Sequence, residues 1–260
     1  MAELLVTGGT GVLGREAVPA LRAAGHKVGV LSREPGDGDV VGDLSEPDAG
    51  ARLAPALAGV ETVLHLASSP RREVWETDVG GTRRLAVAAR EAGVGHLLLV
   101  SVPGADDVPY SYNHAKYAAE EVVAASGVPY TVLRATQFHP FLALLIELVH
   151  RGPVLPVGRG WPLQPVDAGD VAAHLVELVA AGPAGGVVEF GGPEVRDAAD
   201  LARSYLAVRG GGRVLPLPVP GAFSRAVRAG GMLPAPDAPR GTVTWEQWLA
   251  RTGGESPYEV

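Results

Sequence analysis

The sequence predicts an α/β fold in which a doubly wound parallel sheet carries helices on both faces. Strands of five to seven residues alternate with helical stretches, most of them ten residues or longer, through the first two thirds of the chain. The strands are apolar runs, which is typical of strands covered on both faces. A glycine-rich turn separates the first strand from the first helix. Right-handed crossovers then give the doubly wound order.

The elements follow in chain order. The run ELLVT at 3–7 is a short buried-type strand that stops at glycines, and an amphipathic helix follows at 12–24. The run KVGVL at 27–31 ends at Ser-Arg-Glu-Pro, and a brief strand at 40–41 leads into Gly-Asp-Leu. We then expect a helix at 49–57, a strand at 60–66 and a long helix at 73–92. A strand at 95–101, a helix at 111–126 and a strand at 130–134 complete the series.

After about residue 135 proline and glycine interrupt this rhythm. We expect helices there at 138–149, 170–179, 196–208, 221–229 and 244–251. The pattern predicts a nucleotide-binding core at 1–135 and a smaller, mainly substrate-binding lobe at 136–260, with some elements returning to the core. Ligands of open α/β sheets bind at the carboxyl edge of the strands, which this lobe is expected to cover.

Composition narrows the class of protein. The 260 residues are 47% hydrophobic and 20% charged, which excludes a disordered chain. The net charge of −7 disfavours a nucleic-acid partner, since such binding needs clustered positive charge. No apolar run approaches the roughly 20 residues of a membrane-spanning helix, and an acidic residue stands where a signal peptide would be basic. We therefore expect a soluble, cytoplasmic protein with no membrane partner.

Metal and acyl-transfer chemistry have little support in the sequence. Zero cysteines exclude disulfides, thiolate catalysis and zinc–cysteine sites. The seven histidines, among them His114, His139 and His150, show no H-x-x-x-H spacing on one helix, so we expect no metal site. The G-x-S-x-G elbow of α/β-hydrolases is absent.

The turn Thr7–Gly14 reads TGGTGVLG and predicts a dinucleotide site. Its glycines fit G-x-G-x-x-G through Gly9, Gly11 and Gly14, or G-x-x-G-x-x-G through Gly8, Gly11 and Gly14. Glycine allows the tight turn and the close approach of backbone to a diphosphate, and the helix start supplies amides and positive potential. An ordinary glycine turn is the alternative, whereas a Walker loop is excluded because no Lys-Ser/Thr pair follows. The expected contacts are Gly8, Thr10, Gly11, Val12, Leu13 and Gly14.

The tip of the second strand predicts the adenosine end of the site. Ser32 and Arg33 offer a hydroxyl and a guanidinium, which suit the 2′-phosphate of NADP(H). Glu34 lies one place too far along the chain for the usual ribose contact and would repel this phosphate slightly. NADP(H) is therefore favoured, with NAD(H) still open, and a solvated surface arginine is the other interpretation of Arg33. Asp43 could accept from the adenine amino group beside the Leu44 amide, or it could cap the next helix.

These segments together resemble the short-chain dehydrogenase/reductase superfamily and, within it, the atypical NmrA-like branch of NAD(P)-binding proteins. The resemblance spans nearly the whole chain, and it implies a Rossmann fold. It also implies that Ala67, Ser68 and Ser69 line the cofactor ribose and that Ala135 to Phe138 lie near the nicotinamide. The matching segments are TGGTGVLG (7–14), LSREP (31–35), GDL (42–44), HLAS (65–68), GGTRRLAVAAREAGV (80–94), LLLVS (97–101), YNHAKYAAEE (112–121), SGVPYTVLRATQF (126–138), VDAGDVA (166–172) and EFGGPE (189–194).

Tyr112 and Lys116 are the expected catalytic pair, since the spacing puts both on one helical face. A phenol with an ordinary pKa near 10 exchanges protons at neutral pH only if a neighbouring charge stabilises the phenolate, and a lysine one turn away does so. Lys116 could also hold the nicotinamide ribose. Packing of both side chains is the alternative. Ser101, at the end of its strand, is expected to bond the substrate oxygen.

Two features depart from catalytic relatives in the superfamily. Only ten residues separate Ser101 from Tyr112, where a longer loop is usual, and Asp78 stands where extended members often carry asparagine. Such departures are compatible with altered chemistry or with a domain that binds its cofactor and does not turn it over.

The expected function is an NAD(P)(H)-dependent oxidoreductase, favoured as a reductase, acting on a hydrophobic or aromatic small molecule. The resemblance implies a setting in secondary metabolism, such as polyketide tailoring, including oxygenation. The alternative is a non-catalytic NAD(P) redox sensor of the NmrA type. His139 could touch substrate or could be packed. Four aromatic residues could likewise line a substrate pocket or belong to the core: Phe141, Trp161, Phe223 and Trp248.

Overall fold

The computed structural model describes residues 1–36, 38–69, 74–150 and 152–258. It divides into two compact units, each with its own hydrophobic core. The first unit comprises Met1–Ser101, Ser111–Arg134 and Val171–Val188. The second comprises Val102–Tyr110, Ala135–Asp170 and Glu189–Val260.

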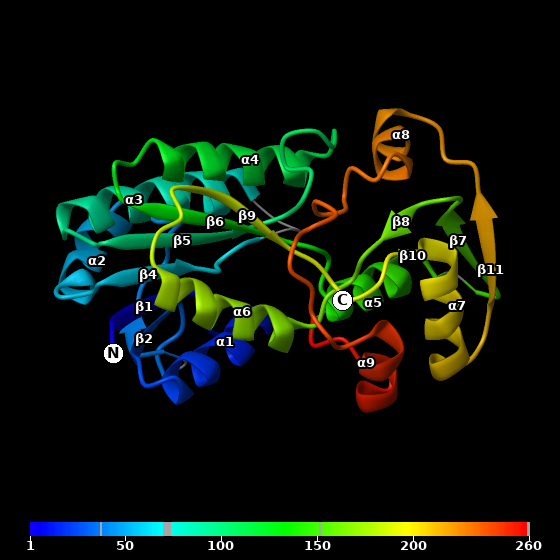
Figure 1. The fold of residues 1–260 in the computed structure, drawn as a ribbon, viewed down its shortest axis with the longest axis horizontal. Coiled ribbons are helices and arrows are strands. Elements are labelled where there is room, and N and C mark those ends of the chain that lie inside the picture. Colours follow the sequence, from blue (N-terminus) through cyan, green and yellow to red (C-terminus); the bar gives the residue numbers. More distant parts are fainter. Residues whose placement is uncertain (37, 70–73, 151, 259–260) are drawn as a thin grey trace. The chain divides into compact units, whose positions relative to one another are not determined.

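A seven-stranded sheet in the order β3-β2-β1-β4-β5-β6-β9 forms the centre of the first unit (Figure 1). The strands are β1 (Glu3–Thr7), β2 (Lys27–Ser32), β3 (Val40–Val41), β4 (Thr62–His65), β5 (His96–Ser101), β6 (Tyr130–Ala135) and β9 (Gly186–Phe190). β1 pairs in parallel with both β2 and β4, so the strand order reverses at β1. The predicted doubly wound parallel sheet is confirmed, and its switch point lies at the carboxyl end of β1.

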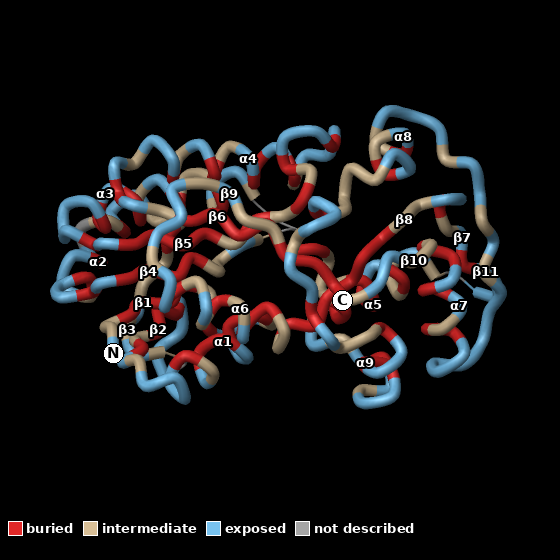
Figure 2. Tube along the Cα trace, in the orientation of Figure 1, coloured by how far each residue is buried: buried red, intermediate tan, exposed pale blue. Residues whose placement is uncertain are grey.

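Helices cover both faces of this sheet. They are α1 (Val12–Ala23), α2 (Ala49–Leu57), α3 (Thr82–Glu91), α4 (Ser111–Ala124) and α6 (Ala168–Ala181). In Figure 1, α3 and α4 lie on one side of the sheet and α1 and α6 on the other. Figure 2 shows the sheet strands mainly buried, while the helices carry alternating buried and exposed residues, which is the amphipathic pattern read from the sequence. Leu57, Leu85 and Leu97 of the core have no exposed surface.

The expected single helix at 73–92 is instead two segments. A π-helical turn, η1 (Trp75–Gly81), runs directly into α3, while the expected start at Glu73 lies outside the described residues. Gly80 and Gly81 are poor helix formers, and a Cβ at Gly81 would lie 3.0 Å from the Cβ of Leu44. The extra residue of the π turn re-aims the side chains before it and buries Asp78.

The second unit contains α5 (His139–Val149), α7 (Ala198–Arg209), α8 (Ala222–Arg228) and α9 (Trp245–Thr252), close to the expected helices. Strand β7 (Val154–Gly158) pairs in parallel with β11 (Arg213–Leu217), and β8 (Pro162–Leu163) pairs antiparallel with β10 (Arg196–Asp197). The sequence did not predict these strands, because they are short and rich in proline and glycine. α7 starts at residue 198, since the Asp197 side chain accepts from the Ala199 amide as an N-cap. Within the described residues, no helix combines the length and apolar character needed to cross a membrane.

Candidate dinucleotide and proton-transfer site

The glycine turn after β1 is built by close backbone contacts. Gly8 has a φ of +71°, in the left-handed region, and its carbonyl accepts from the Gly11 amide at 3.1 Å. A Cβ at Gly14 would lie 2.3 Å from the Gly8 carbonyl oxygen, so only glycine lets α1 pack this close to the turn. Gly9 is also confined, since a Cβ there would lie 2.6 Å from Val30 Cγ1, so the turn uses the glycines of both motif interpretations.

The start of α1 is open to an anion. Gly11 is the N-cap residue and has no side chain with which to cap, and a Cβ there would meet only the Gly8 carbonyl oxygen, at 3.3 Å. Thr10 is exposed and Val12 half-buried, while Leu13 packs its side chain into the core and leaves only its backbone for a ligand. The N-cap position therefore places no side chain over the first-turn amides, and the helix dipole adds positive potential there, which fits a diphosphate.

The adenosine-side residues lie at the tip of β2 and after β3. Ser32 is buried and its Oγ accepts from the Glu34 amide at 3.2 Å, whereas Arg33 is exposed. Burial alone would raise the pKa of Asp43, but hydrogen bonds from the Ser45 amide and hydroxyl and the charge of Arg33 hold it below its ordinary value. The residue before α2 is Asp48, so Asp43 caps a local turn at Ser45 and not the helix. The buried Leu44 follows it.

Tyr112 and Lys116 lie one turn apart on α4, where they meet residues from two other elements. The Tyr112 hydroxyl is 3.2 Å from Ser68 Oγ, in the segment after β4. Lys116 Nζ donates to Asp78 Oδ1 at 3.3 Å. Ser68 Oγ donates to the same Asp78 oxygen at 2.7 Å, and the Ser69 amide donates to Asp78 Oδ2 at 2.9 Å. The structure thus gathers a phenol, a hydroxyl, a carboxylate and an ammonium group.

A chain of buried hydrogen bonds links the end of β1 to the backbone of Asp78. Thr7, at the end of β1, has its Oγ1 2.7 Å from His65 Nδ1, and His65 Nε2 is 2.8 Å from Thr82 Oγ1. Thr82 Oγ1 in turn donates to the Asp78 carbonyl. Burial, with the positive charge of Lys116, lowers the pKa of His65 to about 3, so the ring is neutral. Sequence reasoning did not single out His65, although a histidine ending an apolar strand was the available signal.

Ser101 does not join Tyr112. Its buried hydroxyl donates to Glu120 Oε1, and Arg134 donates to the two Glu120 oxygens at 3.0 and 2.7 Å. Strand register explains why Ser101 meets Glu120 and Arg134. Ser101 pairs with Arg134 across β5 and β6, and Glu120 lies one turn after Lys116 on α4. This arrangement argues against the expected role of Ser101 at a substrate oxygen. The hydroxyl beside the phenol is that of Ser68, which was predicted only as a ribose contact.

The other predicted residues belong to the second unit. Ala135 is buried at the end of β6, and Phe138 is the half-buried residue preceding α5. Trp248 belongs to the core, whereas Phe141, Trp161 and Phe223 are half-buried. For Trp248 the structure agrees with the second of the two alternatives, a core residue, because the amphipathic helix α9 buries its tryptophans.

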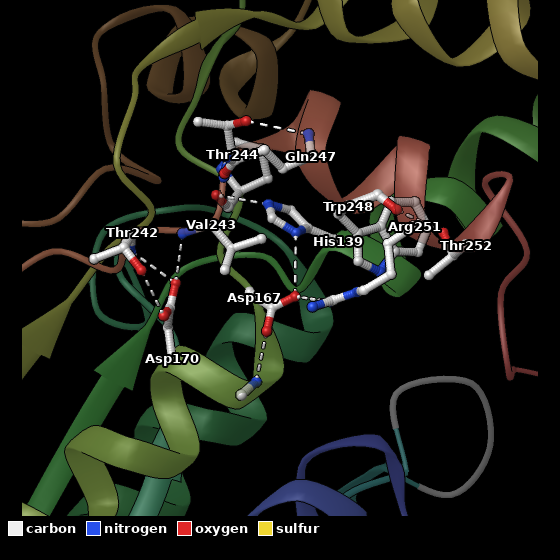
Figure 3. Close-up of polar contacts among 12 residues, drawn as sticks. His139, Asp167, Asp170, Thr242, Val243, Thr244, Gln247, Trp248, Arg251 and Thr252 are labelled. Carbon is white, nitrogen blue, oxygen red and sulfur yellow. Dashed lines mark hydrogen bonds and ion pairs between the residues drawn. The ribbon is translucent and has the colours of Figure 1, made fainter.

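His139 is packed, as one of its two interpretations held. It has no exposed surface, its Nε2 lies 3.2 Å from the Pro165 carbonyl, and its ring centroid is 5.8 Å from that of Trp248. Burial lowers the pKa of His139 to about 4. Figure 3 shows the ring between Asp167 and the tryptophan, with Arg251 bonded to the same aspartate at 2.6 Å. This network stabilises the second unit and leaves no face of the ring for substrate.

The fold and the turn define a dinucleotide-binding protein of the Rossmann type. Residues 8–181 match the family model described as NAD(P)H-binding, and the chain belongs to that family. This match confirms the NAD(P)-binding fold and family that the resemblance implied.

Several curated relatives are reductases. The chain is 33% identical over 219 residues to a (4-alkanoyl-5-oxo-2,5-dihydrofuran-3-yl)methyl phosphate reductase from Streptomyces griseus, covering 80% of this chain and 74% of that protein. It is 32% identical over 154 residues to a 2-alkyl-3-oxoalkanoate reductase from Stenotrophomonas maltophilia, covering 48% and 45%. It is 30% identical over 219 residues to a rice divinyl chlorophyllide a 8-vinyl-reductase, covering 73% and 54%. The chain spans about half the length of the last two proteins.

Solved structures share the fold over nearly the whole chain. An NADPH-dependent quinone oxidoreductase from Escherichia coli, complexed with NADPH, has a TM-score of 0.79 at 21% identity and covers 95% of this chain and 99% of its own. A short-chain dehydrogenase/reductase superfamily protein from Agrobacterium tumefaciens with bound NAD has a TM-score of 0.71 at 22% identity, covering 96% of both chains. At these identities the likeness shows the fold alone.

Proposed function

We propose that the protein is an NAD(P)(H)-dependent oxidoreductase that reduces a hydrophobic or aromatic small molecule. The observation that carries the proposal is the half-buried Tyr112 phenol, set on the same unit as an anion-binding glycine turn and one helical turn from Lys116. The reductase names of the relatives support it. The family resemblance favours a secondary metabolite such as a polyketide as substrate, with oxygenation as the variant chemistry.

The first unit offers groups for most of the cofactor. Backbone amides of the turn at Gly8–Gly14 would hold the diphosphate, and Ala67, Ser68, Ser69 and Lys116 would line the nicotinamide ribose. Asp43 would accept from the adenine amino group. Arg33, exposed at the tip of β2 beside the Ser32 hydroxyl, would bind a 2′-phosphate, so NADP(H) is the preferred cofactor.

Tyr112 acts as the proton donor in this proposal. Bound reduced nicotinamide supplies a hydride, that is, one hydrogen with two electrons. The Tyr112 hydroxyl gives its proton to the substrate oxygen as the carbonyl carbon gains the hydride, so that C=O becomes CH–OH. Solvent then reprotonates the phenol, which is half-buried and not sealed from water.

A redox sensor is the second candidate, favoured by one observation. The Lys116 ammonium group is already paired with Asp78, whereas a freer lysine would stabilise a phenolate more strongly. A sensor would bind the dinucleotide through the same turn and carry its signal to a protein partner.

Turnover separates the two functions. NADPH absorbance is followed with a panel of quinones and ketones, for the wild type and for Tyr112→Phe. We expect the wild type to consume NADPH, and the variant to lose about 100-fold in kcat while its NADPH Kd stays unchanged. Tight NADPH binding without turnover of any member of the panel would favour the sensor. Absence of binding by either dinucleotide would refute both functions.

A further inference from the structure

Asp78 bonds three groups of the cluster around Tyr112. One carboxylate oxygen accepts from Ser68 Oγ at 2.7 Å and from Lys116 Nζ at 3.3 Å, and the other accepts from the Ser69 amide at 2.9 Å. Ser68 in turn lies 3.2 Å from the Tyr112 hydroxyl. The carboxylate is therefore two hydrogen bonds away from the phenol, and the link is a single hydroxyl.

The charge of this carboxylate is kept out of water. The side chains of Asp78 and Lys116 are 1% and 3% exposed, so solvent screens their interaction little. The neighbouring His65 ring is neutral, with a pKa lowered to about 3 by its burial. Among the described residues that these contacts join, the charged groups are Lys116 from α4 and Asp78 from η1, and they form an ion pair.

The backbone of Asp78 is also held by a hydrogen bond. The π turn η1 carries this residue, and such turns recur at functional sites, where they re-aim a side chain. The Thr82 hydroxyl donates to the Asp78 carbonyl, and His65 holds Thr82 at 2.8 Å. Both the backbone and the side chain of Asp78 are therefore bonded to residues outside η1.

We propose that Asp78 is a positioning residue: it holds Ser68 against Tyr112 and pairs with Lys116, so that the hydroxyl and the ammonium group are fixed around the phenol that donates the proton. The inference rests on the proposed function and deepens it. It assigns the hydroxyl beside the phenol to Ser68 in place of Ser101, and it gives the carboxylate at 78 a role that an asparagine there would not fill. Removing the countercharge leaves the ammonium group to favour phenolate.

Kinetics of Asp78→Asn test the role. For reduction, the alkaline limb of the pH–rate profile is expected to move toward lower pH by about one unit, because an uncancelled ammonium group favours loss of the phenolic proton. The NADPH Kd is measured on the same variant, because Asp78 bonds Ser68, Ser69 and Lys116, the proposed ribose contacts. Glu76→Gln is the matched control, since it removes the same charge from an exposed side chain of η1 that pairs with Arg84. An unmoved limb in Asp78→Asn, or an equal shift in Glu76→Gln, overturns the proposal.

Ser68→Ala gives a second test in a variant that should fold, because Ser68 is exposed. We expect kcat to fall about tenfold, and Ser68→Thr to restore most of it. A kcat equal to that of the wild type in Ser68→Ala would show that Asp78 does not act through this hydroxyl.

Stability measurements are independent of turnover. Urea unfolding of Asp78→Asn, Lys116→Met and the double variant forms a double-mutant cycle. We expect the double variant to be less destabilised than the sum of the single changes, because each single change leaves one buried charge unpaired. Additive losses would refute the ion pair. Failure of the wild type to consume NADPH overturns the proposed function, whereas an active wild type with an unmoved Asp78→Asn profile overturns this inference alone.

Discussion

Ser68 Oγ lies 3.2 Å from the Tyr112 hydroxyl, although the two residues come from different elements and are separated by 44 positions. The contact joins the segment after β4 to the first turn of α4. In a parallel sheet both places lie at the carboxyl edge, where ligands of such folds bind. The residue that meets the phenol is therefore determined by how neighbouring β–α units align, and the nearest serine in sequence, Ser111, has no part in it.

The glycine turn should not tolerate a methyl group at Gly14. In Gly14→Ala the new Cβ would clash with the Gly8 carbonyl oxygen, so we expect a loss of about 1–3 kcal/mol in the free energy of unfolding and no measurable NADPH binding by calorimetry. Gly29→Ala is the matched control, because a Cβ in that strand position meets nothing nearer than 3.7 Å. Full NADPH affinity in Gly14→Ala would contradict the assignment of the turn.

Cofactor preference should depend on Arg33. A charge-assisted contact contributes about 1.5–3 kcal/mol, so Arg33→Ala should weaken NADPH roughly ten- to a hundredfold and leave NADH almost unchanged. Kd values for both dinucleotides provide the measurement. Arg52→Ala serves as the control, because that arginine is paired with Glu46 and Asp48 on the surface. Equal losses for the two cofactors in Arg33→Ala would mean that the guanidinium does not bind a 2′-phosphate.

Ser101 should matter for stability and little for catalysis. Ser101→Ala removes one donor from the buried Glu120 carboxylate, at a cost of about 1–3 kcal/mol in the free energy of unfolding. Arg134 still neutralises that carboxylate, so the fold should persist and kcat should stay within about threefold of the wild type. Urea unfolding and steady-state kinetics are measured on the same preparation. A large kcat loss without a stability loss would return Ser101 to the catalytic role predicted from sequence.

Lowering the pH should reduce the free energy of unfolding of the first unit, because His65 is buried in its neutral form. Its folded pKa is about 3, below the ordinary value of 6.5, so the unfolded chain binds the extra proton first as the pH falls. The stability that the neutral ring contributes is complete above about pH 6.5 and is lost progressively toward pH 3, at about 1.4 kcal/mol per pH unit.

The pH effect is isolated by substitution. Urea unfolding between about pH 5.5 and pH 4 should show a shallower loss in His65→Gln than in the wild type. His114→Gln, an exposed histidine on α4, is the control and should leave the slope as it is. Parallel slopes for the wild type and His65→Gln would show that His65 does not titrate on unfolding.

Local patterns in the chain were enough for strands β1 to β6, the covering helices and the glycine turn, whereas the edge strand β9 was not predicted. Apolar runs and amphipathic spacing act within one element, so the strands at 3–7 and 27–31 and the helix at 49–57 could be read almost residue by residue. The strands of the second unit and the π turn escaped, since they depend on pairing partners and on packing against Leu44. Neither leaves a periodic signal.

By itself the sequence determined a doubly wound sheet, a turn suited to diphosphate, and a tyrosine and lysine on one helical face. Those features rest on residues a few positions apart. Only the tertiary structure decided which side chains meet. In the structure Ser101 donates to Glu120, and His139 packs against two tryptophans. Asp78 accepts hydrogen bonds from both Ser68 and Lys116. Strand register and the π turn bring together residues far apart in the chain, and packing of whole elements sets both.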